Sequence, residues 1–91
     1  MNVYYGTQAR LVASHDWGEA DRMLTFFTED LGRVDAIAKS VRAAKSKLKG
    51  HLTLFSRLRI MVTPARQGNG ARELWRLLDA EKSFDSEVTL D

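Results

Sequence analysis

The sequence predicts a small all-β domain that contains one short helix. Three observations lead to this prediction. The chain has 91 residues, 44% of them hydrophobic, which is enough for one modest core. Five short segments show the alternation or the β-forming composition that is typical of strands. Between the third and the fourth of these segments, the spacing of apolar residues changes to a helical period.

The first three predicted strands lie in the N-terminal half of the chain. The second of them is rich in β-forming residues and offers Phe26 and Phe27 to a core. Residues 16–19 supply the turn before it, and a polar loop that ends in Gly32 suits a hairpin after it. The third strand carries Val34, Ala36 and Ala38 on one face. The three strands are predicted at residues 7–14, 23–28 and 33–39.

A helix is predicted over residues 40–49. Ser40 can accept a bond from a free backbone N–H at the start of a helix, and Gly50 stands where the helix would stop. Apolar residues at helical spacing are Val41, Ala44 and Leu48. About ten residues are too few for a stable isolated helix. We therefore expect this segment either to dock on the rest of the domain or to remain mobile.

Residues 55–63 form the clearest strand of the sequence. Arg57 and Arg59 face one way, and Pro64 ends the strand. The opposite face carries Leu58, Ile60 and Val62. A fifth strand is predicted at residues 73–81, although the leucines in it also fit a helix.

The predicted order is therefore β-β-β-α-β-β. Five short strands with one helix between the third and the fourth describe the OB-fold, a five-stranded Greek-key barrel that is widely used to bind oligonucleotides. An SH3-like barrel is the main alternative, but a helix at this point fits it less well.

Positive charge is concentrated in one part of the chain. Residues 36–72 hold nine of the fourteen Lys and Arg residues and none of the twelve acidic residues. This segment carries a charge of +9 and the remainder −7, which the net charge of +2 conceals. A concentrated cationic segment attracts polyanions, of which nucleic acid is the commonest. The alternative is an ordinary solvated surface.

The residues that enzymes and metal sites require do not form a recognisable pattern. Cysteine is absent, so the chain has no disulfide, thiolate metal site or thiol nucleophile. His15 and His51 are isolated, and the carboxylates of residues 16–21 match no complete calcium loop. No hydrolase or phosphate-loop motif occurs. We expect no enzyme activity, no cofactor and no metal. No apolar run approaches the roughly 20 residues that span a bilayer.

Two tryptophans are candidates for stacking on bases. Trp17 and Trp75 could act in this way, as aromatic residues do in single-strand binders. Packing at the edge of a small core is the interpretation we favour for both. The phenylalanines are expected in the core, and they are Phe26, Phe27, Phe55 and Phe84.

Several short sequence segments of the chain, taken in order, resemble the N-terminal domain of the RecO family of recombination and repair mediators. The resemblance covers roughly residues 7–84. Its segments are residues 18–22 (GEADR), 24–28 (LTFFT), 32–33 (GR), 36–39 (AIAK), 42–48 (RAAKSKL), Leu52, 55–56 (FS) and 80–81 (AE). The chain departs from the family at three positions. The family usually has glycine where Ser40 stands, often a second basic residue where Ala43 stands, and commonly proline where Leu54 stands.

The resemblance implies an OB-fold that binds single- and double-stranded DNA and contributes to strand annealing. It also implies partners, namely a RecR-like ring and single-stranded-DNA-binding protein, with which the family helps RecA to load. The implied location is the bacterial cytoplasm, near the nucleoid. Family members normally continue into a helical domain. We therefore expect a RecO-like domain at residues 1–84 and an acidic tail at 85–91, where that helical domain would begin. The chain is either an N-terminal domain alone or an unusually short relative.

Three hypotheses for function follow. The leading one is a DNA-binding module without catalysis, whose contacts to phosphates position the nucleic acid without reading its sequence. The expected contact residues are Lys39, Arg42, Lys45, Lys47, Lys49, Arg57 and Arg59. The second is an RNA-binding OB domain, which the basic segment alone does not exclude. The third is a protein-interaction module whose basic face docks on an acidic partner.

Overall fold

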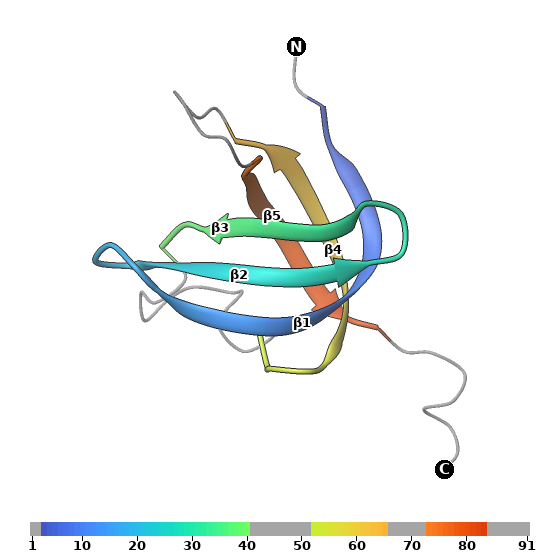
Figure 1. The fold of residues 1–91 in the computed structure, drawn as a ribbon, viewed down its shortest axis with the longest axis horizontal. Helices are drawn as coiled ribbons and strands as arrows, with labels where there is room; N and C mark the ends of the chain where they lie inside the picture. The colour runs from blue at the N-terminus through green and yellow to red at the C-terminus, as the bar shows by residue number, and fades with distance from the viewer. Residues whose placement is uncertain (1–2, 41–51, 66–72, 84–91) are drawn as a thin grey trace.

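Five strands close into a barrel in the computed structural model, which describes residues 3–40, 52–65 and 73–83. Around the barrel, the strands follow the order β1-β2-β3-β5-β4, and β4 pairs again with β1 (Figure 1). The strands are β1 (Tyr5–Trp17), β2 (Asp21–Thr28), β3 (Gly32–Ala38), β4 (Arg57–Pro64) and β5 (Trp75–Lys82).

The long strand β1 pairs with two neighbouring strands. Its first half pairs with β4, and its second half pairs with β2, each time antiparallel. The register with β2 shifts between Leu11 and Ala13. Such an irregularity bends a strand and increases its twist. In Figure 1, β1 accordingly curves around one side of the barrel and reaches both neighbours.

The barrel closes through a short parallel pairing of β3 with β5. Ala36 lies opposite Trp75, and Ile37 lies opposite Arg76. All other pairings are antiparallel. A five-stranded barrel with this non-sequential strand order is consistent with the OB-fold. The predicted fold class is therefore confirmed. The described residues contain no helix, and the predicted helix lies outside them except for Ser40.

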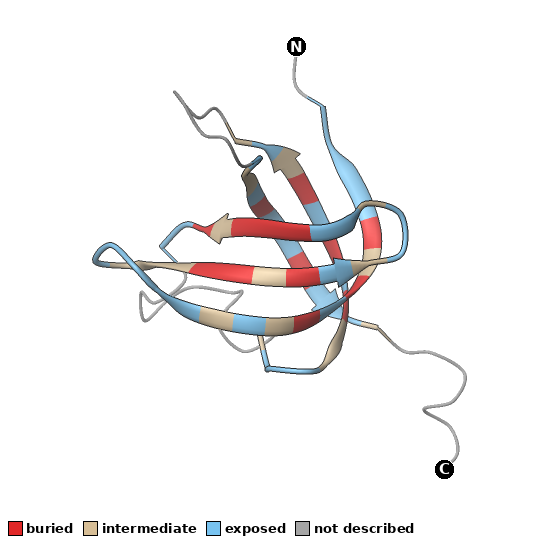
Figure 2. Cartoon of the chain, viewed as in Figure 1, coloured by how far each residue is buried: buried red, intermediate tan, exposed pale blue. Residues whose placement is uncertain are grey.

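Alternation along the strands builds the core. Side chains of successive strand residues point to opposite faces, so every second residue enters the barrel. Figure 2 shows buried bands that alternate with exposed or partly exposed ones, most regularly along β4. The predicted inward face of β4 is confirmed, because Leu58, Ile60 and Val62 are all buried. The largest fully buried side chains are Phe26, Leu11, Leu24, Leu58, Ile60, Val34 and Val62.

Two of the phenylalanines predicted in the core are exposed. Phe26 is buried, but its neighbour Phe27 is 58% exposed, since adjacent residues of one strand cannot face the same side. Phe55 is 63% exposed and precedes β4, so the strand begins two residues later than predicted. Its φ of 70° is left-handed, which removes it from the strand. Phe84 lies outside the described residues.

The tryptophans also have different surroundings. Trp75 packs against the core and meets Tyr5 edge-on, with ring centroids 5.5 Å apart. Trp17 is 46% exposed and belongs to the end of β1 instead of the predicted turn. Edge packing is therefore confirmed for Trp75. No helix in the described part of the chain is long and apolar enough to cross a membrane.

Candidate nucleic-acid interface

Three of the seven predicted phosphate contacts lie in the described part of the chain. Lys39 follows β3 directly, and its Nζ atom lies 3.5 Å from Oδ2 of Asp21. Arg57 and Arg59 lie on the outward side of β4, because the residues that alternate with them are buried. The remaining four, which fall outside the described residues, are Arg42, Lys45, Lys47 and Lys49.

The two arginines of β4 have different charged residues opposite them on the neighbouring strands. Arg59 lies opposite Glu81 of β5. Both residues line a small surface pocket together with Asp79. These two carboxylates lower the positive potential around Arg59. Arg57 instead lies opposite Arg10 of β1, so that two positive charges share one place on the outer surface. At the start of β4, two guanidinium groups therefore lie on the same side of the barrel.

A row of outward side chains continues from Arg57 across four strands. Arg57 is paired with Arg10, Arg10 with Phe27, and Phe27 with Arg33. Directly opposite residues share a face of the sheet, with Cβ atoms about 4.5–5.5 Å apart. We call these four residues the outer row. It contains three positive charges and one exposed aromatic ring.

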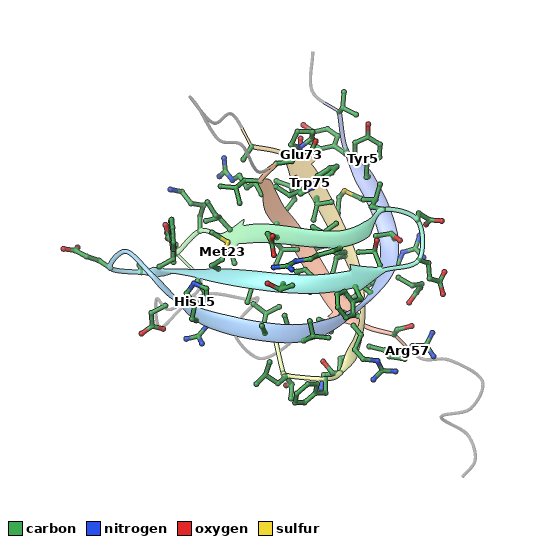
Figure 3. The ribbon with its side chains drawn as sticks, viewed as in Figure 1. Tyr5, His15, Met23, Arg57, Glu73 and Trp75 are labelled. Carbon is green, nitrogen blue, oxygen red and sulfur yellow. The ribbon has the colours of Figure 1, made fainter. Side chains whose placement is uncertain are left out.

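A hollow of about 300 Å³ lies beside the outer row. Arg10, Arg57 and Phe27 all line it, and Glu29 is the one acidic residue among the described residues of its lining. The other lining residues are Gln8, Ala9 and Thr28. Figure 3 shows Arg57 at the end of the barrel that is remote from Tyr5 and Trp75. The hollow therefore combines positive charge with an aromatic wall, away from the ring pair at the opposite end.

Hydrogen bonds connect two arginines of the outer row, Arg10 and Arg33, to the rest of the barrel. The Arg10 Nη1 atom donates to the carbonyl oxygen of Phe55 at 2.7 Å. The Phe55 N–H in turn donates to the carbonyl oxygen of Leu11 at 2.6 Å, which ties the segment before β4 to β1. The Arg33 Nε atom lies 3.4 Å from Oδ1 of Asp35, a buried carboxylate that also accepts from Thr25. Arg10 is thus tied to the segment before β4, and Arg33 makes a longer contact to a buried carboxylate.

Sequence reasoning missed Arg10, Phe27 and Arg33 as candidates. All three lie outside segment 36–72, which holds no acidic residue. The high density of positive charge along that segment was the basis on which the contact residues were predicted. A weaker signal was available, because each of them occupies an outward position of its strand. That signal does not show which strands are neighbours, and only the register brings the three together with Arg57.

Acidic and histidine side chains do not gather into a metal site in the ranges that the structure describes. His15 meets Trp17 edge-on, with centroids 6.3 Å apart. Asp16 pairs with Arg22 at 2.6 Å, and Asp21 accepts the backbone N–H of Ser40 at 2.6 Å. Asp16 and Asp21, two of the carboxylates near the first turn, are therefore engaged in local structural contacts.

Comparison with known proteins identifies the family. The family model described as "Recombination protein O N terminal" matches residues 1–80. The DNA repair protein RecO of Dehalococcoides mccartyi is 53% identical over 51 residues, which are 56% of this chain and 20% of that protein. The RecO protein of Desulfitobacterium hafniense is 39% identical over 56 residues, or 62% and 20% of the two chains. That of Bifidobacterium adolescentis is 47% identical over 49 residues, or 54% and 20%.

The matches span a fifth of the length of these relatives. The family model nevertheless covers most of this chain, and it is the model of an N-terminal domain. The closed five-stranded barrel agrees with the fold that the sequence resemblance implied. The chain therefore belongs to the RecO family, and what it carries is the N-terminal domain of that family.

Proposed function

We propose that this chain is the DNA-binding module of a RecO-like recombination and repair mediator, and that it acts without catalysis. The observation that carries the proposal is the pairing of Arg57 with Arg10 on the outside of the barrel, beside a hollow lined by Phe27. Like charges placed directly opposite each other are unfavourable in a free protein. A polyanion bound across them places negative charge against both guanidinium groups.

The basic segment supplies the remaining contacts in this proposal. Phosphates are met by the predicted residues Lys39, Arg42, Lys45, Lys47, Lys49, Arg57 and Arg59. Each contact releases a condensed counterion, so binding depends steeply on salt and little on sequence. Of the two arginines of β4, Arg59 contributes less than Arg57 in this proposal, because Glu81 and Asp79 lie beside it.

The family also bears on what the module does once it holds DNA. The relatives are named DNA repair proteins. We propose that the module binds single- and double-stranded DNA, contributes to strand annealing, and serves RecA loading together with a RecR-like partner and single-stranded-DNA-binding protein.

Fluorescence anisotropy over a salt series tests the proposal. The ligands are labelled DNA and RNA oligonucleotides of matched length and sequence. If four or five charges make contact, log K for single-stranded DNA falls with log salt at a slope of about −3. The variant with Lys45, Lys47 and Lys49 all replaced by Ala is expected to bind every sequence more weakly, with a flatter slope.

Other outcomes of this experiment favour the other hypotheses. A strong preference for RNA would identify an RNA-binding domain, since discrimination requires contacts to 2′-hydroxyl groups. Absence of binding to either nucleic acid would contradict the proposal and favour a protein-interaction module. An unchanged slope in the triple-lysine variant would assign the contacts to other residues of the chain.

A further inference from the structure

We propose that the outer row is a subsite for unpaired DNA, in which a base stacks on Phe27 while phosphates lie against the arginines on either side. This inference rests on the proposed DNA binding and adds to it a specific surface and a preference for single strands. It involves Arg10, Phe27 and Arg33, which lie outside the basic segment.

The ring of Phe27 is available to a ligand. It is 58% exposed, although the adjacent Phe26 is fully buried in the same strand. Among the described residues, the two ring–ring contacts are Tyr5 with Trp75 and His15 with Trp17, and Phe27 takes part in neither. Base–aromatic stacking needs such a ring, and it tolerates any base because every base has a π-face.

The residues beside Phe27 on the neighbouring strands can contact the phosphate groups of a nucleotide. Arg10 lies opposite Phe27 on β1, and Arg33, which also contacts Asp35, lies opposite it on β3. A guanidinium group therefore stands on each side of the ring. Neighbouring strands lie about 4.8 Å apart, so the four residues of the outer row cover about 14 Å of surface. That length accommodates a short stretch of extended backbone running across the strands, with its bases turned toward the barrel.

The surroundings of the ring are preorganised. Thr28 Oγ1 donates to the carbonyl oxygen of Gly32 and accepts the N–H of Leu31, each at 2.8 Å, which fixes the hairpin that follows Phe27. Arg10 is held by the carbonyl of Phe55. A surface that is ordered before binding loses less conformational entropy when the ligand arrives.

The stacking explains why the subsite prefers a single strand. In a duplex, both faces of each internal base are covered by its neighbours, and only the edges are open in the grooves. A duplex can therefore use the arginines of the outer row but not Phe27. A single strand can use both, because its bases are free to unstack.

The test uses the 91-residue chain and two variants of the ring. Phe27→Leu keeps an apolar side chain but removes the aromatic face, whereas Phe27→Tyr keeps the face. Anisotropy is measured with three ligands: a single strand, an abasic single strand of equal length, and a duplex. For Phe27→Leu we expect a loss of about 5- to 140-fold on the normal single strand. Binding to the abasic strand and to the duplex should change little, and the salt slope should be unchanged.

Two control variants test the assignment. Phe27→Tyr should bind all three ligands like the wild type. Trp17→Leu removes another exposed aromatic residue, at the far end of β1, and should leave binding to all three unchanged. Thermal unfolding checks that each variant remains folded at the assay temperature.

Photo-crosslinking of the wild-type chain provides a second readout that does not depend on any variant. A single strand carrying 5-iododeoxyuridine is expected to attach to residues 23–33, between the trypsin sites at Arg22 and Arg33, with Phe27 as the modified residue. Crosslinks confined to other peptides would overturn the inference.

The outcomes separate this inference from the proposal on which it rests. If the wild type binds DNA and Phe27→Leu binds a single strand equally well, the stacking subsite is wrong while DNA binding stands. The stacking subsite is also wrong if Phe27→Leu weakens binding to the abasic strand as much as binding to the normal single strand. If the wild type binds no DNA, the proposed function itself fails.

Discussion

Arg57 of β4 lies directly opposite Arg10 of β1, whereas Arg59, two residues further along β4, lies opposite Gln8 of β1 and Glu81 of β5. Two arginines on the same face of one strand thus have different cross-strand partners, a second arginine for Arg57 and a carboxylate for Arg59. The difference arises from the neighbouring strands, since the two residues are of the same type and both point outward.

This difference predicts unequal roles for the two arginines in binding DNA. Arg57→Gln is expected to weaken binding to every DNA and to reduce the salt slope by about 0.7 for single strands, the value of one phosphate contact. Arg59→Gln serves as the matched control and should have a smaller effect on both quantities. Anisotropy over a salt series measures them. Equal losses in the two variants would show that the local carboxylates do not matter.

Glu29 opposes the proposed ligand in the hollow. Its backbone N–H donates to the carbonyl oxygen of Gln8 at 3.0 Å, but its side chain is exposed and lines the hollow with Arg10 and Arg57. Glu29→Gln should therefore raise DNA affinity roughly two- to five-fold at low salt, and less as salt increases.

The matched control for this prediction is Glu19→Gln, which removes the same charge from the exposed turn between β1 and β2. An equal gain in this variant would indicate a general effect of net charge. In that case the hollow would have no special part in binding.

Ile60 of β4 is one of the largest fully buried side chains of the core. It is 1% exposed, so Ile60→Ala is expected to cost about 2–5 kcal/mol of unfolding free energy through lost burial and the cavity that remains. Met61 is the next residue and is 43% exposed, so Met61→Ala should cost much less. Urea unfolding followed by circular dichroism measures both. A neutral effect of Ile60→Ala would mean that the strand faces the other way.

Phe55 occupies a strained backbone conformation. Its φ is 70° and its side chain is 63% exposed, so glycine there relieves strain while little burial is lost. Phe55→Gly should stabilise the fold by about 1 kcal/mol. Leu54 is also exposed but is not among the described residues with positive φ, and Leu54→Gly should destabilise the fold by about 0.5–1 kcal/mol. Denaturant midpoints that shift in the same direction for both variants would contradict the assignment.

Complete recombination mediation is not expected of this chain on its own. One small barrel can hold a strand, but loading another protein requires simultaneous attachment to several partners, which takes more surface. The relatives it matches are about five times as long as the aligned segment. A RecA-loading assay on DNA coated with single-stranded-DNA-binding protein, with RecR supplied, measures this. Full stimulation by the chain alone would contradict the expectation.

Local pattern was sufficient for several features of the fold. Alternation over residues 57–63 placed Leu58, Ile60 and Val62 inside, because successive side chains of any strand must face opposite sides. The same rule decides between Phe26 and Phe27, but only when the inward face of β2 is known. The start of β4 was misplaced, since the left-handed conformation of Phe55 follows from its bonds to β1 and not from its own preferences.

The sequence by itself determined that the chain is a small barrel with a cationic segment, because strand periodicity and charge are properties of neighbouring residues. The family was also recognisable from short sequence segments in the right order. Only the tertiary structure decided which charges stand together. Arg10, Phe27, Arg33 and Arg57 come from four strands, and their alignment depends on strand order and register. Register is a relation between distant segments that is set by closing the barrel around a shared core, and no local window of the chain contains it.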